Sequence, residues 1–129
     1  MKFQQPGYWK TILVTLLILI ACLLPSNELK NIKILNFQYE DLLIHFIMFF
    51  TFSFILYSDL NKRKRSGSKN NYNSLIVITA GIVLGFLSEL FQYLIISLHR
   101  SASLFDFLFD IIGTICGIFL IKLIHIAKK

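Results

Sequence analysis

The chain has 129 residues and a net charge of +6; 56% of its residues are hydrophobic and only 16% are charged. Soluble domains are about 45–50% apolar and about 25% charged, so this composition excludes an ordinary soluble domain. The apolar residues form runs near the roughly 20 residues that a helix needs to cross a bilayer, which predicts an integral membrane protein. The positive charge then reflects topology and anionic lipid headgroups. We expect no nucleic-acid binding, because only Tyr72 lies near the basic run to stack on a base.

The first apolar segment, residues 8–24, begins with two interfacial aromatic residues and is closed by Pro25. Its apolar part is short for a membrane span, so a cleaved signal peptide is the alternative, and Leu19–Cys22 resembles a lipoprotein cleavage box. The apolar run continues beyond this box as far as Pro25. We therefore predict a retained span.

Three further spans are predicted at residues 41–58, 75–98 and 104–126, with a basic loop at residues 59–74. Each spanning segment has to satisfy its own backbone hydrogen bonds, which favours helices. Because the connections are short, the pattern predicts an all-α, integral membrane four-helix bundle that forms a single domain over residues 1–129.

The distribution of lysine and arginine predicts the orientation. With both termini in the cytoplasm, the outside keeps only Lys30, Lys33 and Arg100, and the other ten of the 13 basic residues are cytoplasmic. This bias follows the positive-inside rule. We therefore predict that both termini are cytoplasmic and that loop 59–74 is a cytoplasmic loop.

This topology brings polar side chains of three spans to the outer half of the membrane. They lie one or two turns from the outer ends of the second, third and fourth spans, and within each span they are spaced to share one helix face. The residues are Asp41, His45, Glu89, Gln92, Asp106 and Asp110, with Arg100 in the last turn. A charged group at the centre of a membrane helix costs roughly 2.5–3.5 kcal/mol, so we expect these groups to be paired or used.

Other features have structural explanations. Two small-xxx-small patterns, which let helix backbones approach closely, are expected to clamp the third and fourth spans together: Gly81 with Gly85, and Gly113 with Gly117. His125 is expected to be an interfacial residue without a role. Cys22 and Cys116 form neither a CxxC motif nor a Cys/His cluster and are expected to be packing residues.

The polar residues, taken in order, resemble the VanZ-like family of small bacterial membrane proteins. The family pattern has an acidic residue and a histidine one turn apart, Gly-x-x-x-Glu-x-x-Gln, an arginine, serine and aspartate, and then Asn-x-x-Gly-x-x-x-Gly. The matching residues are Asp41, His45, Gly85, Glu89, Gln92, Arg100, Ser103, Asp106, Asp110, Gly113 and Gly117. Asp110 stands where the family has asparagine.

The resemblance implies a multi-pass protein of the bacterial cytoplasmic (inner) membrane, in a family named for low-level resistance to the glycopeptide teicoplanin. It implies no mechanism, and resistance is not assumed for this chain. It places the polar residues in the cell envelope, where lipid-linked and headgroup-bearing compounds are available as ligands.

The leading hypothesis is an envelope protein that binds or modifies a lipid-linked or anionic headgroup ligand at the outer leaflet, in contact with membrane lipids. His45, Glu89 and Asp106 are the candidate catalytic residues, with His45 and Glu89 as an acid–base pair. The candidate ligand-binding residues are Asp41, Gln92, Arg100, Ser103 and Asp110. No nucleophile is identified, no cofactor or metal is predicted by this hypothesis, and whether the chain is an enzyme stays open.

Three alternatives remain. The cluster could be a buried network of Arg100 with Asp106 or Glu89 that fixes helix register in a non-enzymatic scaffold or subunit. It could be a metal-assisted hydrolase with His45, Glu89, Asp106 and Asp110 as ligands. Proton-coupled transport is the last alternative, and it would require an oligomer to line a path.

Overall fold

The computed structural model of the chain describes residues 7–25, 39–62, 72–95 and 102–128. These residues form four helices and no strand, which confirms the all-α prediction. The helices are α1 (Trp9–Leu23), α3 (Glu40–Lys62), α4 (Tyr72–Leu94) and α5 (Leu104–Ala127).

Three of the helices have the length and composition to cross a membrane. Helices α3, α4 and α5 contain 23, 23 and 24 residues, which corresponds to about 35 Å at 1.5 Å per residue, against a hydrocarbon core of about 30 Å. Helix α1 is also apolar but has only 15 residues, or about 22 Å. The chain is therefore a multi-pass membrane protein with three membrane-length helices, and the crossing by α1 stays a prediction.

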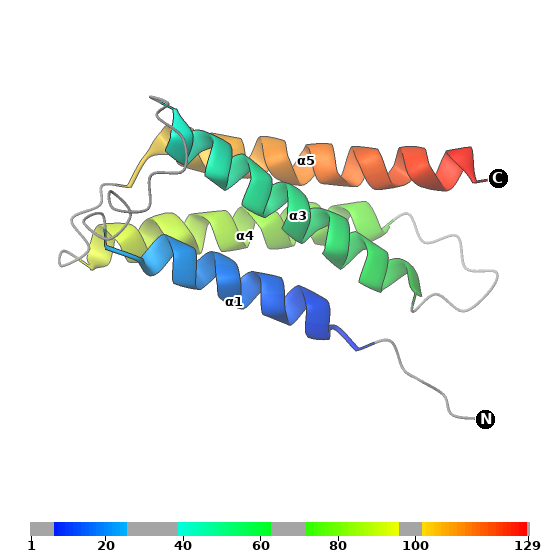
Figure 1. Cartoon of the computed structure of the whole chain (residues 1–129), viewed down its shortest axis with the longest axis horizontal. Helices are drawn as coiled ribbons and strands as arrows, with labels where there is room; N and C mark the ends of the chain where they lie inside the picture. The colour runs from blue at the N-terminus through cyan, green and yellow to red at the C-terminus, as the bar shows by residue number, and fades with distance from the viewer. Residues whose placement is uncertain (1–6, 26–38, 63–71, 96–101, 129) are drawn as a thin grey trace.

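The four helices lie side by side in a bundle (Figure 1). Helices α3 and α5 run in one direction and α1 and α4 in the other, so the start of α1 and the end of α5 lie at the same end of the bundle. The side of the membrane on which this end lies is not fixed by the fold, and the predicted cytoplasmic termini stay a prediction.

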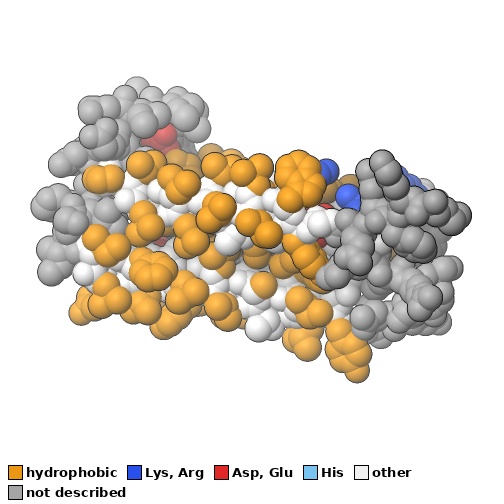
Figure 2. Space-filling view, turned by 90° about the horizontal axis from the view of Figure 1, so that it is seen from below, with side chains coloured by type: hydrophobic (Ala, Val, Ile, Leu, Met, Phe, Trp, Pro, Cys, Tyr) orange, Lys and Arg blue, Asp and Glu red, His pale blue; other side chains and the backbone are white. Residues whose placement is uncertain are grey.

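Aliphatic and aromatic side chains from every helix meet along the bundle axis. The buried residues of this apolar cluster are Ile18, Cys22, Phe49, Phe52, Leu56, Val77, Leu84 and Ile118. The outward faces are apolar as well: Figure 2 shows hydrophobic side chains covering the visible face between its two ends. Trp9, Phe86 and Phe119 are each more than half exposed. Soluble monomers rarely expose such continuous apolar surface, so these faces contact lipid.

The glycine pairs bring different helices together. A Cβ atom on Gly81 would lie 2.6 Å from Thr114 Oγ1 of α5, so Gly81 belongs to the contact between α4 and α5. A Cβ atom on Gly113 would lie 2.5 Å from the Phe46 carbonyl oxygen, and one on Gly117 would lie 2.5 Å from the Phe50 carbonyl oxygen. The expectation that Gly113 and Gly117 clamp α5 to α4 is wrong, because α5 turns this face to the backbone of α3.

Candidate functional site

The candidate site lies near the end of the bundle where α3 and α5 begin and α4 ends. His45 is five residues from the start of α3, Glu89 five from the end of α4, and Asp110 six from the start of α5. At 1.5 Å per residue, all three lie about 7–9 Å from their helix ends. Three separate helices thus deliver one polar residue each to the same depth.

The shortest contact of the site joins α3 to α5. His45 Nδ1 lies 2.8 Å from Asp110 Oδ1. Both side chains are buried, with exposed fractions of 2% and 0%. Because a carboxylate oxygen accepts, Nδ1 carries the hydrogen and donates it, and this bond fixes the imidazole orientation. The other ring nitrogen, Nε2, lies 4.0 Å from Asp106 Oδ2.

Glu89 joins α4 to the start of α5. Its Oε2 accepts a hydrogen bond of 2.7 Å from the backbone N–H of Ser103, the residue just before α5. The first N–H groups of a helix have no partner within it, and the helix dipole favours a negative charge there. Ser103 makes no side-chain cap of its own, so Glu89 supplies an acceptor at this end of α5 from another helix.

Two carboxylate oxygens of the site are unusual. Glu89 Oε1 and Asp110 Oδ2 are buried without a hydrogen-bond partner, and they are the only such side-chain atoms in the described part of the chain. Buried polar groups in native proteins are almost always paired, and an unpaired one calls for an explanation. A purely structural network would be expected to satisfy both.

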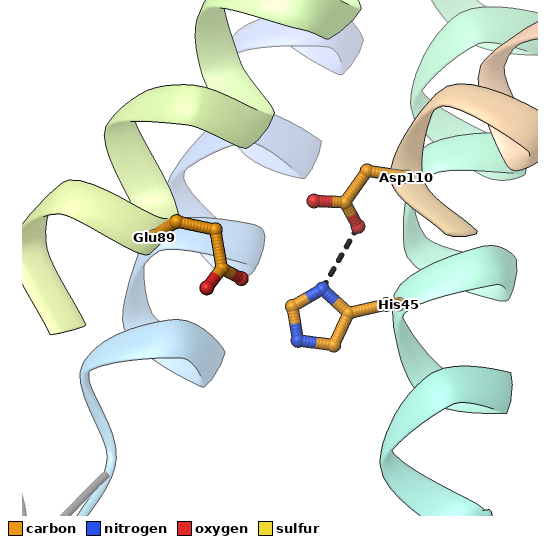
Figure 3. A group of neighbouring side chains, drawn as sticks. All are labelled: His45, Glu89 and Asp110. Atoms are coloured by element: carbon orange, nitrogen blue, oxygen red, sulfur yellow. Dashed lines mark hydrogen bonds and ion pairs between the residues drawn. The ribbon is translucent and has the colours of Figure 1, made fainter. Parts of the chain in front are cut away.

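His45, Glu89 and Asp110 form one compact group. One nitrogen or oxygen atom of each lies within 4.8 Å of the corresponding atom of the other two. Figure 3 shows the imidazole and the Glu89 carboxylate facing each other from α3 and α4, with Asp110 above the ring. An imidazole and two carboxylates at this spacing suit proton exchange or the binding of a cation.

Gly85 accounts for the close approach of α4 to this group. A Cβ atom at position 85 would lie 3.1 Å from Asp110 Oδ2 and 3.3 Å from Phe107 Cδ2. The glycine one turn before Glu89 therefore leaves the space that the Asp110 carboxylate occupies. The spacing Gly-x-x-x-Glu thus combines a packing position and a polar position on one helix face.

The other predicted site residues are only partly brought together. Asp106 is half-buried beside His45 Nε2, whereas the Asp41 side chain is exposed in the first turn of α3. Buried Gln92 donates from Nε2 to the Cys22 carbonyl oxygen at 3.3 Å, so it binds the last turn of α1. Arg100 lies outside the described residues.

Sequence reasoning missed a second set of polar contacts at the opposite end of the bundle. Thr11 Oγ1 donates to Asp59 Oδ2 at 2.8 Å and joins α1 to α3, and Asp59 is only 3% exposed. Asp59 is fourteen residues after His45 and lies on the same buried face of α3. This heptad spacing could have identified it.

His125 takes part in these contacts and is not the bystander expected. Its Nδ1 donates to the Ile121 carbonyl oxygen at 2.7 Å, which leaves Nε2 to accept from Asn61 Nδ2 at 3.3 Å. Asn61 Oδ1 in turn accepts from Asn73 Nδ2 at 3.0 Å. The chain of bonds connects α4, α3 and α5.

Comparison of the chain with protein-family models, curated proteins and solved structures gives no match. The resemblance to the VanZ-like family therefore stays a prediction. The observations on which a function can be based are the membrane-length helices and the buried His45–Asp110 pair with Glu89.

Proposed function

We propose that the protein is a multi-pass protein of the bacterial cytoplasmic membrane that binds and acts on a lipid-linked or anionic headgroup ligand. In this proposal both termini are cytoplasmic, and the site of His45, Glu89 and Asp110 lies in the outer half of the bilayer. The depth of about 7–9 Å below the helix ends is where headgroups meet acyl chains. The VanZ-like resemblance and the excess of basic residues on the predicted cytoplasmic side support the same orientation.

The observation that carries the proposal is the buried His45–Asp110 hydrogen bond beside a Glu89 oxygen that has no partner among the described residues. Asp110 positions the imidazole, as the orienting carboxylate does in a catalytic triad. His45 Nε2 and Glu89 Oε1 then exchange a proton with a hydroxyl or phosphate of the ligand. Asp106, 4.0 Å from His45 Nε2, stabilises the imidazolium that forms when Nε2 takes up the proton.

The scaffold alternative explains these contacts less well. A buried network that only fixes helix register stabilises the fold most when each of its polar groups has a hydrogen-bond partner. Here two carboxylate oxygens remain without partners among the described residues. Such groups cost stability, and an arrangement that costs stability is typical of a site shaped by function.

The test measures ligand binding to the purified full chain in detergent. Farnesyl phosphate serves as the lipid-linked anionic probe, short-chain phosphatidylglycerol as the headgroup probe, and farnesol as the uncharged control. A ligand that binds the folded state raises the unfolding midpoint as its concentration exceeds its dissociation constant. We expect at least one anionic probe to raise the midpoint of the wild type, and farnesol to leave it unchanged.

Glu89→Gln is the variant of choice, because it keeps the side-chain shape and an acceptor for the Ser103 N–H. We expect it to change the stabilisation by the probe, because Glu89 contacts the ligand in this proposal. Thr51→Val is the control, since Thr51 is exposed on α3 and bonds only within its own helix, to the Ile47 carbonyl oxygen. Equal stabilisation of wild type and Glu89→Gln would contradict the proposed function and favour the scaffold.

A further inference from the structure

We infer that His45, Glu89 and Asp110 together bind a single divalent transition-metal ion. The three residues come from α3, α4 and α5 and offer one imidazole nitrogen and two carboxylate oxygens. The inference deepens the proposed function by naming a cofactor for the same site. Binding of the ion does not depend on the proposed function; only the role of the ion in acting on a headgroup ligand rests on it. The proton exchange of His45 and Glu89 with the ligand, as proposed above, would take place in the site without an ion.

The spacing of the three side chains is close to that of ligands around one ion. Zinc binds nitrogen at about 2.0–2.1 Å and oxygen at about 2.0–2.2 Å, so two ligands of one ion lie at most about 4.3 Å apart. The three ligand atoms here lie within 4.8 Å of one another. Binding of the ion would replace the His45 Nδ1–Asp110 Oδ1 hydrogen bond of the ion-free site, and side-chain rotation that closes the group by less than about 1 Å would complete the coordination.

The two unpartnered oxygens are the second, independent observation. Asp110 is fully buried and Glu89 is only 8% exposed, and among the described residues neither Asp110 Oδ2 nor Glu89 Oε1 has a hydrogen-bond partner. Figure 3 shows both carboxylates projecting from their helices into the space around the His45 ring. Unpaired buried acceptors are costly, and a cation among them supplies the missing partner to both.

The donor set also selects the kind of ion. Imidazole suits zinc, copper, iron and nickel, whereas calcium and magnesium prefer oxygen ligands. Three protein ligands leave at least one coordination position open, as in catalytic zinc sites.

The ion would also resolve an electrostatic problem of the proposed function. An anionic headgroup that approaches Glu89, Asp106 and Asp110 is repelled by three carboxylates. A divalent ion between them offsets this repulsion and can itself bind a phosphate or carboxylate oxygen of the ligand.

The test uses the untagged full chain in detergent, treated with a chelator and then titrated with Zn²⁺, Mn²⁺ or Mg²⁺ alone, without added lipid. Calorimetry gives the affinity, and metal analysis after gel filtration gives the stoichiometry. Co²⁺ reports the geometry through its visible absorption. We expect a single Zn²⁺ per chain, weaker Mn²⁺ binding, and no binding of Mg²⁺.

Two conservative variants replace a ligand carboxylate by the neutral amide, and one control removes an exposed histidine. Glu89→Gln and Asp110→Asn are each expected to weaken Zn²⁺ binding by about 10-fold or more, in line with the effect of altering groups at metal sites. His125→Ala should bind as the wild type does, because His125 is exposed and distant along α5. The Co²⁺ absorption should be lost in Glu89→Gln and retained in His125→Ala.

The inference is overturned if the wild type binds no transition metal, or if both conservative variants bind Zn²⁺ as tightly as the wild type. Its failure can be told from failure of the proposed function. Stabilisation by farnesyl phosphate in the presence of a chelator, together with no Zn²⁺ binding by the wild type, would retain the headgroup ligand and reject the ion. Zn²⁺ binding without any response to the lipid probes would retain the ion and reject the headgroup ligand.

Discussion

Replacing Glu89 with glutamine removes one charge from the buried group and preserves the size of the side chain. The amide oxygen can still accept the Ser103 N–H, which bonds to Glu89 Oε2 at 2.7 Å in the native protein. That bond becomes neutral rather than charge-assisted, which costs about 1 kcal/mol. The Glu89–Ser103 contact alone therefore predicts a slightly less stable protein.

The neighbouring carboxylate acts in the opposite direction and with greater weight. Ligand atoms of Glu89 and Asp110 lie within 4.8 Å, where two negative charges repel by about 3 kcal/mol at an effective dielectric constant of about 20. We expect the free energy of unfolding of chelator-treated Glu89→Gln to exceed that of the wild type by about 2 kcal/mol. The measurement is SDS-induced unfolding in mixed micelles, with the thermal midpoint as a second reading.

Leu84→Ala is the packing control on the same helix. Leu84 is 8% exposed and lies in the apolar core, so its truncation should lower the free energy of unfolding by about 2–5 kcal/mol. If Glu89→Gln lowers the stability by a similar amount, the carboxylate belongs to a buried pair that holds the helices together. The interpretation of Glu89 as a site residue under electrostatic strain would then be refuted.

Three further predictions concern stability in the same SDS assay. His45→Ala should lower the free energy of unfolding by about 3–5 kcal/mol, because it leaves the Asp110 carboxylate buried without a partner. Gly113→Ala should lower it by about 1–3 kcal/mol, because the new Cβ atom would lie 2.5 Å from a carbonyl oxygen of α3. Thr11→Val should lower it by about 1–3 kcal/mol, because Asp59 loses the hydroxyl that donates to it at 2.8 Å.

Two of these substitutions have a matched control that makes the same chemical change at a less constrained position. Gly7→Ala adds a Cβ atom that would lie 3.8 Å from its nearest neighbour. Thr51→Val removes an exposed hydroxyl that bonds within its own helix. Such surface changes usually stay within about 0.5 kcal/mol. If a control lowers the free energy of unfolding as much as its partner variant does, the burial or contact invoked for that position would be contradicted.

The helices were predictable where the apolar run alone defines them, and their ends were not. The predicted second span stops at residue 58, whereas α3 continues to Lys62. Asp59 and Asn61 look like loop residues in a sequence, because a polar group after an apolar run usually marks the membrane boundary. Here they have partners on α1, α4 and α5, so the helix continues through them.

The convergence of the site residues was also predictable, because it follows from topology and helical spacing. Antiparallel spans place the start of α5 beside the end of α4, and the start of α3 joins them, so His45, Glu89 and Asp110 reach a common depth. The individual partners were not predictable. Gln92 bonds to the Cys22 carbonyl oxygen, and this acceptor becomes available only because α1 ends at Leu23 beside α4.

The two polar groups of the bundle differ in a way that bears on function. At the end where α1 begins and α5 ends, hydrogen bonds join Thr11 to Asp59 and connect the series Asn73, Asn61 and His125. In the described residues, none of the buried side-chain polar atoms at that end lacks a partner. The fold therefore can satisfy polar side chains between these helices.

At the other end, one oxygen of Glu89 and one of Asp110 have no partner within the described part of the chain. Register and packing do not require this, because the glycine contacts and the apolar core already fix how α3, α4 and α5 approach one another. A buried carboxylate oxygen that has no partner among the described residues costs stability, and it is best explained by something that binds to it. The unsatisfied end is therefore the end where a cation and a headgroup should be sought, and the satisfied end provides the internal comparison.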